Sequence, residues 1–301
     1  MNRIPEKIIK TLIKNSLIKE SQENPGILKK ILGVDYKDIE NKGKEIYGKT
    51  KEAYKYMTKG MFSINTNTHK ITFMSSPYTG AAEKAQELYS SWNSLKKEDQ
   101  YETSKAGREW IKKNIYGQIE KRQSYVDNWG KQLGGEKESY WSSWTFGVCY
   151  KDDPDYSDMM AQSGLGELNL AFYPTGSSKR NLEAIKKDPE AFLNKTLYCL
   201  FDPKANDIPV FKGDGVFFSR DPGLRSYKDI PTKKGKPSHM RIVIDDSGMA
   251  IGGNEAYPNN PSKGTRIGKS SENFVDGKVT KKSCLGVFKK ISVVKVEKLN
   301  D

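Results

Sequence analysis

The chain has 301 residues, of which 35% are hydrophobic, 30% charged and 11% aromatic. This length can bury a sizeable core as one large domain or two smaller ones, and the aromatic content argues against wholesale disorder. The net charge of +13 is uneven, because residues 1–135 carry 25 Lys and Arg against 16 Asp and Glu, whereas the remainder carries 26 against 22. A basic first half suits an anionic partner such as nucleic acid, anionic lipid or a cell wall, and charge alone does not choose among them.

The cysteines and the hydropathy pattern exclude several classes of protein. Cys149, Cys199 and Cys284 lie far apart, with neither a Cys-x-x-Cys pair nor a His/Cys cluster, which argues against a zinc site and a disulfide scaffold. We therefore expect no metal and no cofactor. No run of about 20 apolar residues predicts a transmembrane span. Lysines interrupt the apolar residues of segment 4–18, unlike the core of a signal peptide, so we expect a cytoplasmic or virion-associated protein.

Residues 1–60 have the pattern of lysine-rich helices. Ile4, Ile8 and Leu12 recur at i, i+4 spacing, which gives one apolar stripe with lysines on the other face. Asn24-Pro25-Gly26 breaks the first helix. The stripe suits either an arm that binds a membrane surface or nucleic acid, or helices that pack on the rest of the protein or on a partner chain, such as a neighbour in a virion assembly. We favour packing.

The next segments predict a boundary between two domains. Residues 61–79 alternate and carry turn residues, which indicates strand or loop, and His69 there has the setting of a surface residue. Residues 81–132 return to a helical pattern, with Trp and Tyr at core positions. Gly134-Gly135 is the best boundary in the chain. The sequence therefore predicts a basic, mainly helical region over 1–135 and a second domain over 136–301.

Two segments of the second domain could carry chemistry. Residues 138–149 read as the first turns of a buried helix, whose N-terminus would assist a nucleophile or stabilise an oxyanion. Ser139 or Ser142 could equally be a simple cap. Residues 238–254 read as a hairpin around Asp-Ser-Gly. With Asp246 and Ser247 as the loop, His239 lies opposite Asn254, although a one-residue slip would separate them.

Three blocks in this order carry a family resemblance: 140–146 (YWSSWTF), 213–218 (GDGVFF), and 238–243 (SHMRIV) leading to 252–254 (GGN). Together they resemble the CHAP and NlpC-type branch of the papain-like clan, largely peptidoglycan amidases and endopeptidases. The order and spacing are similar to an uncharacterised bacterial branch with Trp-Ser and Gly-Gly-Asn. The resemblance covers about residues 136–300. It implies a central helix packed on an antiparallel sheet, which the apolar strand predicted at 285–296 would join.

The resemblance implies Ser142 as nucleophile, His239 as base and Asn254 as the residue that orients the imidazole. The departure is serine in place of the catalytic cysteine. A thiol can be driven to a standing thiolate, whereas a serine hydroxyl must lose its proton to His239 during attack. Cys149 is the alternative nucleophile, but two helical turns, about 10 Å, separate it from Ser142, which is too far for both to share one base.

The sequence thus predicts an α+β protein, with an α-rich N-terminal region before a papain-like domain. The leading functional hypothesis is hydrolysis of peptidoglycan amide bonds, with basic charge favouring an anionic wall. The competing hypothesis is a catalytically inactive structural or binding protein, either a virion component or a module that contacts nucleic acid. A composition rich in Lys, Asn and Tyr without a signal peptide suits a phage-encoded protein.

Overall fold

The computed structural model describes residues 60–118, 141–161, 174–204, 208–218, 225–230, 239–256, 265–271, 274–275, 278–279 and 284–299. The chain divides into two compact units, Met1–Lys59 and Gly60–Asp301, and every described residue belongs to the second. The helices predicted before residue 60 therefore lie outside the described residues. Within Gly60–Asp301, the structure mixes helices with an antiparallel sheet, which confirms the α+β class.

An eight-stranded sheet organises this unit, in the order β1-β2-β10-β4-β5-β6-β7, with β3 also paired to β10. All its pairings are antiparallel. Its strands are β1 (Met61–Asn65), β2 (His69–Ser75), β3 (Thr196–Phe201), β4 (Gly215–Phe218), β5 (His239–Val243), β6 (Met249–Ala256), β7 (Thr265–Ser271) and β10 (Cys284–Lys298). A separate two-stranded ribbon consists of β8 (Phe274–Val275) and β9 (Lys278–Val279).

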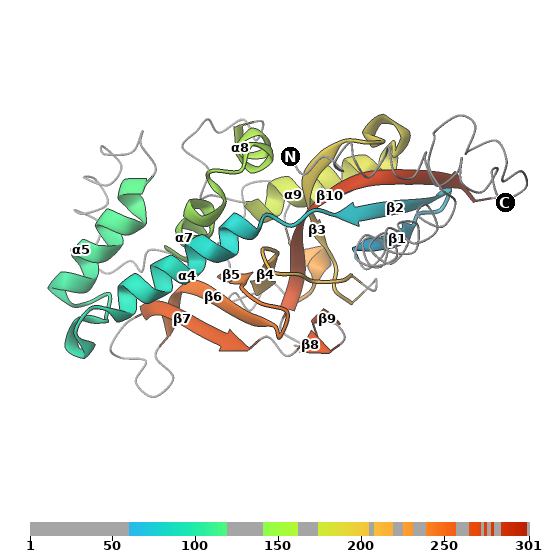
Figure 1. The fold of residues 1–301 in the computed structure, drawn as a ribbon. Helices are drawn as coiled ribbons and strands as arrows, with labels where there is room; N and C mark the ends of the chain where they lie inside the picture. Colours follow the sequence, from blue (N-terminus) through green and yellow to red (C-terminus); the bar gives the residue numbers. More distant parts are fainter. Residues whose placement is uncertain are drawn as a thin grey trace, which may run out of the picture. The chain divides into compact units, whose positions relative to one another are not determined.

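Strand β10 joins the two halves of the sheet (Figure 1). Its first residues pair with β4, whereas Ile291 pairs with Ser75 of β2, so β1 and β2 belong to the same sheet as the strands that follow residue 196. The compact unit consequently begins at Gly60, and the boundary predicted after Gly135 does not divide it. Local composition could not indicate the pairing of β2 with β10, because the two strands lie far apart in the sequence.

The described helices are α4 (Thr79–Asn93), α5 (Lys105–Asn114), α7 (Trp141–Tyr150), α8 (Pro154–Ala161) and α9 (Pro174–Lys187), with 3-10 turns η1 (Lys97–Asp99), η2 (Tyr116–Gln118), η5 (Glu190–Phe192) and η6 (Tyr227–Asp229). Helices α4 and α5 confirm the helical pattern predicted after residue 81, and Trp92 packs edge-on against Trp110 with ring centroids 5.0 Å apart. Helix α4 lies against α7 and contacts β5, β6 and β7 (Figure 1). None of the described helices is long and apolar enough to cross a bilayer.

Apolar side chains form two cores, one on each face of the sheet. Successive strand residues point to opposite faces, and on β4 Phe217 enters one core while Val216 and Phe218 enter the other. The first core lies under α4, α5, α7 and α8 and includes Trp92, Trp110, Trp141, Phe146, Ile242 and Phe288. The second includes Phe62, Phe73, Ile185 of α9, Phe201, Val243 and Val287. The face to which a side chain points therefore decides which helices it can meet.

Candidate functional site

The β5–β6 hairpin has the turn and the register that the sequence predicted near the loop. Ile242 pairs with Ile251 and Val243 with Ala250, the register that follows from a loop at Asp246 and Ser247. The Asp245 carboxylate accepts bonds from the backbone N–H groups of Ser247 and Met249, at 3.0 and 3.1 Å, and closes the turn. Gly248 supplies the positive φ that the turn requires, at +84°.

The register changes further along β6, at a bulge that alters the partner of His239. Pairing with β7 shifts between Gly252 and Glu255, and Asn254 within the bulge has a left-handed φ of +59°. The extra residue turns Glu255 to the His239 side, with Nε2 of His239 2.5 Å from Oε1 of Glu255. The residue that contacts the imidazole is thus Glu255, whereas the sequence predicted Asn254. Asparagine's tolerance of left-handed backbone was the one available signal.

Arg241 holds the Glu255 carboxylate from a second side. Its Nε and Nη2 atoms lie 2.5 Å from Oε1 and 3.0 Å from Oε2, a two-point contact that fixes the plane of the carboxylate. Burial raises the pKa of Glu255, but hydrogen bonds and charge from His239 and Arg241 outweigh it and lower the pKa to about 2. Glu255 is therefore an ionised carboxylate throughout the neutral pH range.

An ionised carboxylate fixes the tautomer of the histidine. Because a carboxylate only accepts hydrogen bonds, the proton of neutral His239 lies on Nε2 and the lone pair on Nδ1. The side chain of His239 is 3% exposed, so the surrounding protein restrains the ring. The contact with Glu255 therefore fixes the orientation of the imidazole.

Ser142 lies in the first turn of α7, on the side of the helix that faces the sheet. The helix packs so closely that a Cβ on Gly253 would lie 2.1 Å from Oγ1 of Thr145, and one on Gly215 would lie 2.7 Å from the ring of Phe146. Viewed along the axis of a helix with 3.6 residues per turn, residue 142 lies at an angle between those of residues 145 and 146. Since β5 lies between β6 and β4, Ser142 is directed toward β5.

Ser142 and His239 approach β5 from opposite faces. His239 pairs with Phe218, whose side chain belongs to the second core, whereas Ile242 pairs with Gly215, which contacts α7 through Phe146. By strand alternation the His239 side chain leaves β5 on the face away from α7. Helix α7 nevertheless begins near the His239 end of β5. Its last residue, Tyr150, donates to the carbonyl of Gly213, and the N–H of Gly213 donates to the carbonyl of Val243 at the other end of β5.

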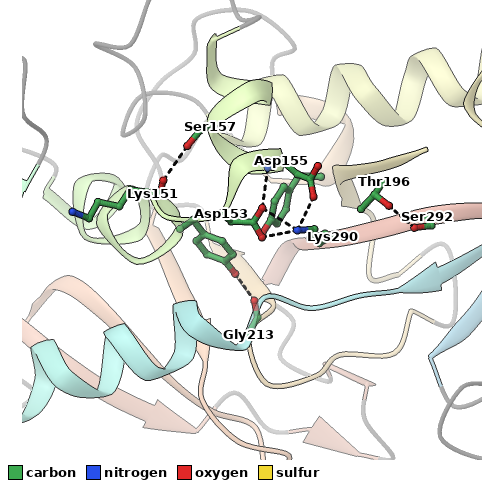
Figure 2. Close-up of polar contacts among 10 residues, drawn as sticks. Lys151, Asp153, Asp155, Ser157, Thr196, Gly213, Lys290 and Ser292 are labelled. Carbon is green, nitrogen blue, oxygen red and sulfur yellow. Dashed lines mark hydrogen bonds and ion pairs between the residues drawn. The ribbon is translucent and has the colours of Figure 1, made fainter. Parts of the chain in front are cut away.

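A polar cluster anchors the far end of α7 to the sheet (Figure 2). The Tyr150 hydroxyl donates to the carbonyl of Gly213 at 2.6 Å. Lys290 of β10 lies 2.7 Å from Asp153 and 2.6 Å from Asp155 in the segment that follows the helix. Burial lowers the pKa of Lys290, but the two carboxylates outweigh it and raise the pKa. This cluster holds α7 at a fixed position over the central strands.

The Gly-Asp turn before β4 contains a buried ion pair. Asp214 and Lys289 of β10 are fully buried, with the ammonium in contact with Oδ2 of Asp214, which also accepts from the N–H of Phe211 at 2.8 Å. Burial raises the pKa of Asp214 and lowers that of Lys289. The pair fixes the turn that leads into β4. Sequence reasoning missed Lys289, because 75 positions separate it from its partner.

The cysteines supply no further nucleophile. All three are buried and reduced, and burial raises the pKa of the Cys149 thiol far above its ordinary value. Among the described residues, no group of three or more His, Cys, Asp and Glu side chains is arranged to hold a metal ion.

No protein-family model matches the sequence, and comparison with curated proteins and with solved structures likewise gives no match.

Proposed function

We propose that the Gly60–Asp301 unit is a papain-like hydrolase that cleaves amide bonds of peptidoglycan. The observation that supports this most strongly is the 2.5 Å contact between Nε2 of His239 and Oε1 of an ionised Glu255, because a carboxylate in this position orients an imidazole for acid–base chemistry. Ser142, in the first turn of the helix directed at β5, is the proposed nucleophile. The ordered sequence blocks that resemble the papain-like clan support the same assignment.

The proposed reaction is an acyl transfer in two steps. Because His239 leaves β5 on the face away from α7, the reaction requires the imidazole to reach around the start of the strand. Oγ of Ser142 then attacks the amide carbonyl, its proton passes to Nδ1 of His239, and Nδ1 returns that proton to the leaving amine as the C–N bond breaks. Water then loses a proton to the same nitrogen and attacks the acyl-enzyme. As the ester C–O bond breaks, Nδ1 returns that proton to Oγ of Ser142 and the acid product is released. Glu255 stabilises the imidazolium in both steps, and the partial positive charge at the start of α7 stabilises the oxyanion.

The substrate class rests on charge and on the resemblance. Peptidoglycan with its attached polymers is anionic, and a chain with a net charge of +13 is attracted to such a surface. The proposed nucleophile and base suit acyl transfer, and the resemblance to peptidoglycan amidases and endopeptidases implies that the scissile bond is an amide.

Loss of turbidity and release of peptides from purified cell walls test this proposal. We expect Ser142→Ala and His239→Gln each to lower turnover by about 1,000-fold or more. The neighbouring Ser143→Ala and the second histidine variant, His69→Gln, are matched controls that keep wild-type turnover. An inactive wild type, or equal activity in wild type and His239→Gln, would refute the hydrolase.

A binding protein without catalysis is the second candidate, and strand alternation favours it. Because His239 leaves β5 on the face away from α7, the imidazole has to reach around the start of the strand to meet Ser142. Retention of an inactive wild type on intact walls would identify a wall-binding module. Salt-sensitive retention on DNA, lost on deletion of residues 1–59, would identify a nucleic-acid-binding one instead.

A further inference from the structure

A polar connection runs from the loop before α5 to the first residue of α7. The indole Nε1 of Trp141 donates to Oγ1 of Thr265 at 3.1 Å. The Thr265 hydroxyl in turn donates to Oε2 of Glu102, and the backbone N–H of Glu102 donates to the carbonyl of Thr265 at 3.0 Å. Glu102 is thus hydrogen-bonded to Thr265 through both its side chain and its backbone.

The connection has a fixed direction. An indole N–H can only donate, so the Thr265 hydroxyl must accept from Trp141 and direct its single proton to Glu102. Position 102 therefore needs an acceptor oxygen, which Glu and Gln both supply. Position 265 needs a hydroxyl, which Thr and Ser supply and valine, of nearly the same shape, does not.

The loop that carries Glu102 is held rigidly at both ends. Gln100 donates to the carbonyls of Asn93 and Leu95 at the end of α4, at 3.1 and 2.8 Å. Ser104 caps α5 by accepting from the N–H of Gly107, and its hydroxyl lies within bonding distance of the Asp99 and Tyr101 carbonyls. Because the loop is fixed to two helices, Glu102 can restrain what it contacts.

Trp141 and Thr265 each lie next to a residue of the proposed site. Trp141 precedes Ser142 on α7, is fully buried and packs against Trp92 with ring centroids 6.2 Å apart. Thr265 pairs with Ala256, the residue after Glu255. One connection therefore reaches the start of α7 and the strand that carries Glu255.

We propose that Glu102 and Thr265 are positioning residues, which hold the Trp141 indole and thereby fix the first turn of α7 with Ser142. This inference rests on the proposed function for its catalytic consequence. It gives residues 60–118, outside the segment that resembles the papain-like clan, a part in building the site. Neither residue contacts the substrate, and both act through Trp141.

Hydrogen exchange tests the positioning without reference to activity. Two signals report it: the Trp141 indole N–H, assigned by replacing each of the five tryptophans with Phe in turn, and the amides of Thr145 and Phe146, whose helical partners are the carbonyls of Trp141 and Ser142. We expect Thr265→Val and Glu102→Leu to accelerate both on the order of 10-fold. Thr265→Ser and Glu102→Gln should stay within about 3-fold of wild type, because they keep the acceptor and the hydroxyl.

Turnover tests the catalytic consequence, with a strand-initial threonine elsewhere as control. Thr265→Val should lower kcat on the order of 10- to 100-fold with little change in KM, because it displaces the nucleophile and leaves substrate binding intact. Thr196→Val removes a comparable hydroxyl, 2.8 Å from Ser292 (Figure 2), and should change neither exchange nor kcat.

The outcomes separate this inference from the proposed function. Unchanged exchange in Thr265→Val overturns the positioning role, whatever the activity. Faster exchange with wild-type kcat overturns its link to Ser142 while the hydrolase stands. An inactive wild type refutes the hydrolase, and the exchange data alone then decide whether Glu102 and Thr265 fix the first turn of α7.

Discussion

Glu255, and not its neighbour Asn254, contacts the imidazole of His239, at 2.5 Å from Nε2. The bulge in β6 causes this, because Asn254 takes a left-handed φ of +59° and the next side chain turns to the His239 face. The two residues therefore have separable roles. Glu255 fixes the tautomer of His239, and Asn254 supplies the backbone conformation that brings Glu255 there.

Substitution at Asn254 should change turnover little, whereas substitution at Glu255 should lower it strongly. Asn254→Gly keeps the left-handed conformation at little cost, so we expect turnover of cell walls within a few-fold of wild type. Glu255→Gln removes the charge that stabilises the imidazolium, and we expect turnover to fall on the order of 10²- to 10⁴-fold. Peptide release under saturating substrate measures both. A larger loss in Asn254→Gly than in Glu255→Gln would return the orienting role to Asn254.

A single substitution, Ser142→Cys, tests whether Ser142 and His239 meet. If the imidazole lies beside position 142, it lowers the pKa of the introduced thiol and the thiolate reacts with iodoacetamide well below pH 8. We expect alkylation at pH 6.5 at least about 10-fold faster than at Ser143→Cys, and slowed to that control rate by adding His239→Gln. Mass spectrometry of the labelled peptide gives the rates. Equal rates at positions 142 and 143 would support the binding protein.

The depressed pKa of Glu255 makes stability fall in acid. The group has a pKa of about 2 when folded against 4.5 ordinarily, so its contribution is complete above pH 4.5 and is lost as the pH falls toward 2. A difference of this size corresponds to about 3 kcal/mol. Urea unfolding of wild type and Glu255→Gln between pH 6 and pH 2 measures it. The stability advantage of wild type should shrink as the pH falls, and a constant advantage would contradict the prediction.

The sequence was sufficient for features set by neighbouring residues. Asp245 and Gly248 fixed the hairpin turn, and the alternation on either side of it gave the correct pairing of Ile242 with Ile251. The same counting failed beyond Gly252, because a bulge adds one residue and reverses every side chain after it. Nothing local distinguishes a bulged Gly-Gly-Asn from a regular one except the tolerance of asparagine for positive φ.

Relationships between distant segments lay beyond the sequence. The pairing of β2 with β10 removed the boundary expected at Gly135, and both strands have ordinary local patterns. Ser142 and His239 lie on opposite faces of β5, because the partner of His239, Phe218, belongs to the second core, whereas Gly215 faces α7. To predict this, one would have to know the register of three strands. Arg241 was visible within the hairpin, but its partner became evident only once the bulge had turned Glu255 toward it.

The buried ion pair of Asp214 and Lys289 contributes to the stability of the fold. Both side chains are fully buried, and the ammonium also lies 4.9 Å from the ring centroid of Phe211. Removing one partner leaves the other charge buried without compensation, so we expect Asp214→Asn or Lys289→Met to cost about 3–5 kcal/mol of unfolding free energy. Asn keeps an acceptor oxygen for the N–H of Phe211, which limits the change to the charge.

The double variant distinguishes an ion pair from two independent packing losses. In Asp214→Asn with Lys289→Met no unpaired charge remains, so we expect it to be more stable than the sum of the single variants implies, with a coupling energy of at least about 2 kcal/mol. Urea unfolding of the four proteins at pH 7 gives this energy. Additive losses would mean that each side chain acts through its own packing, and that the turn before β4 does not depend on the ion pair.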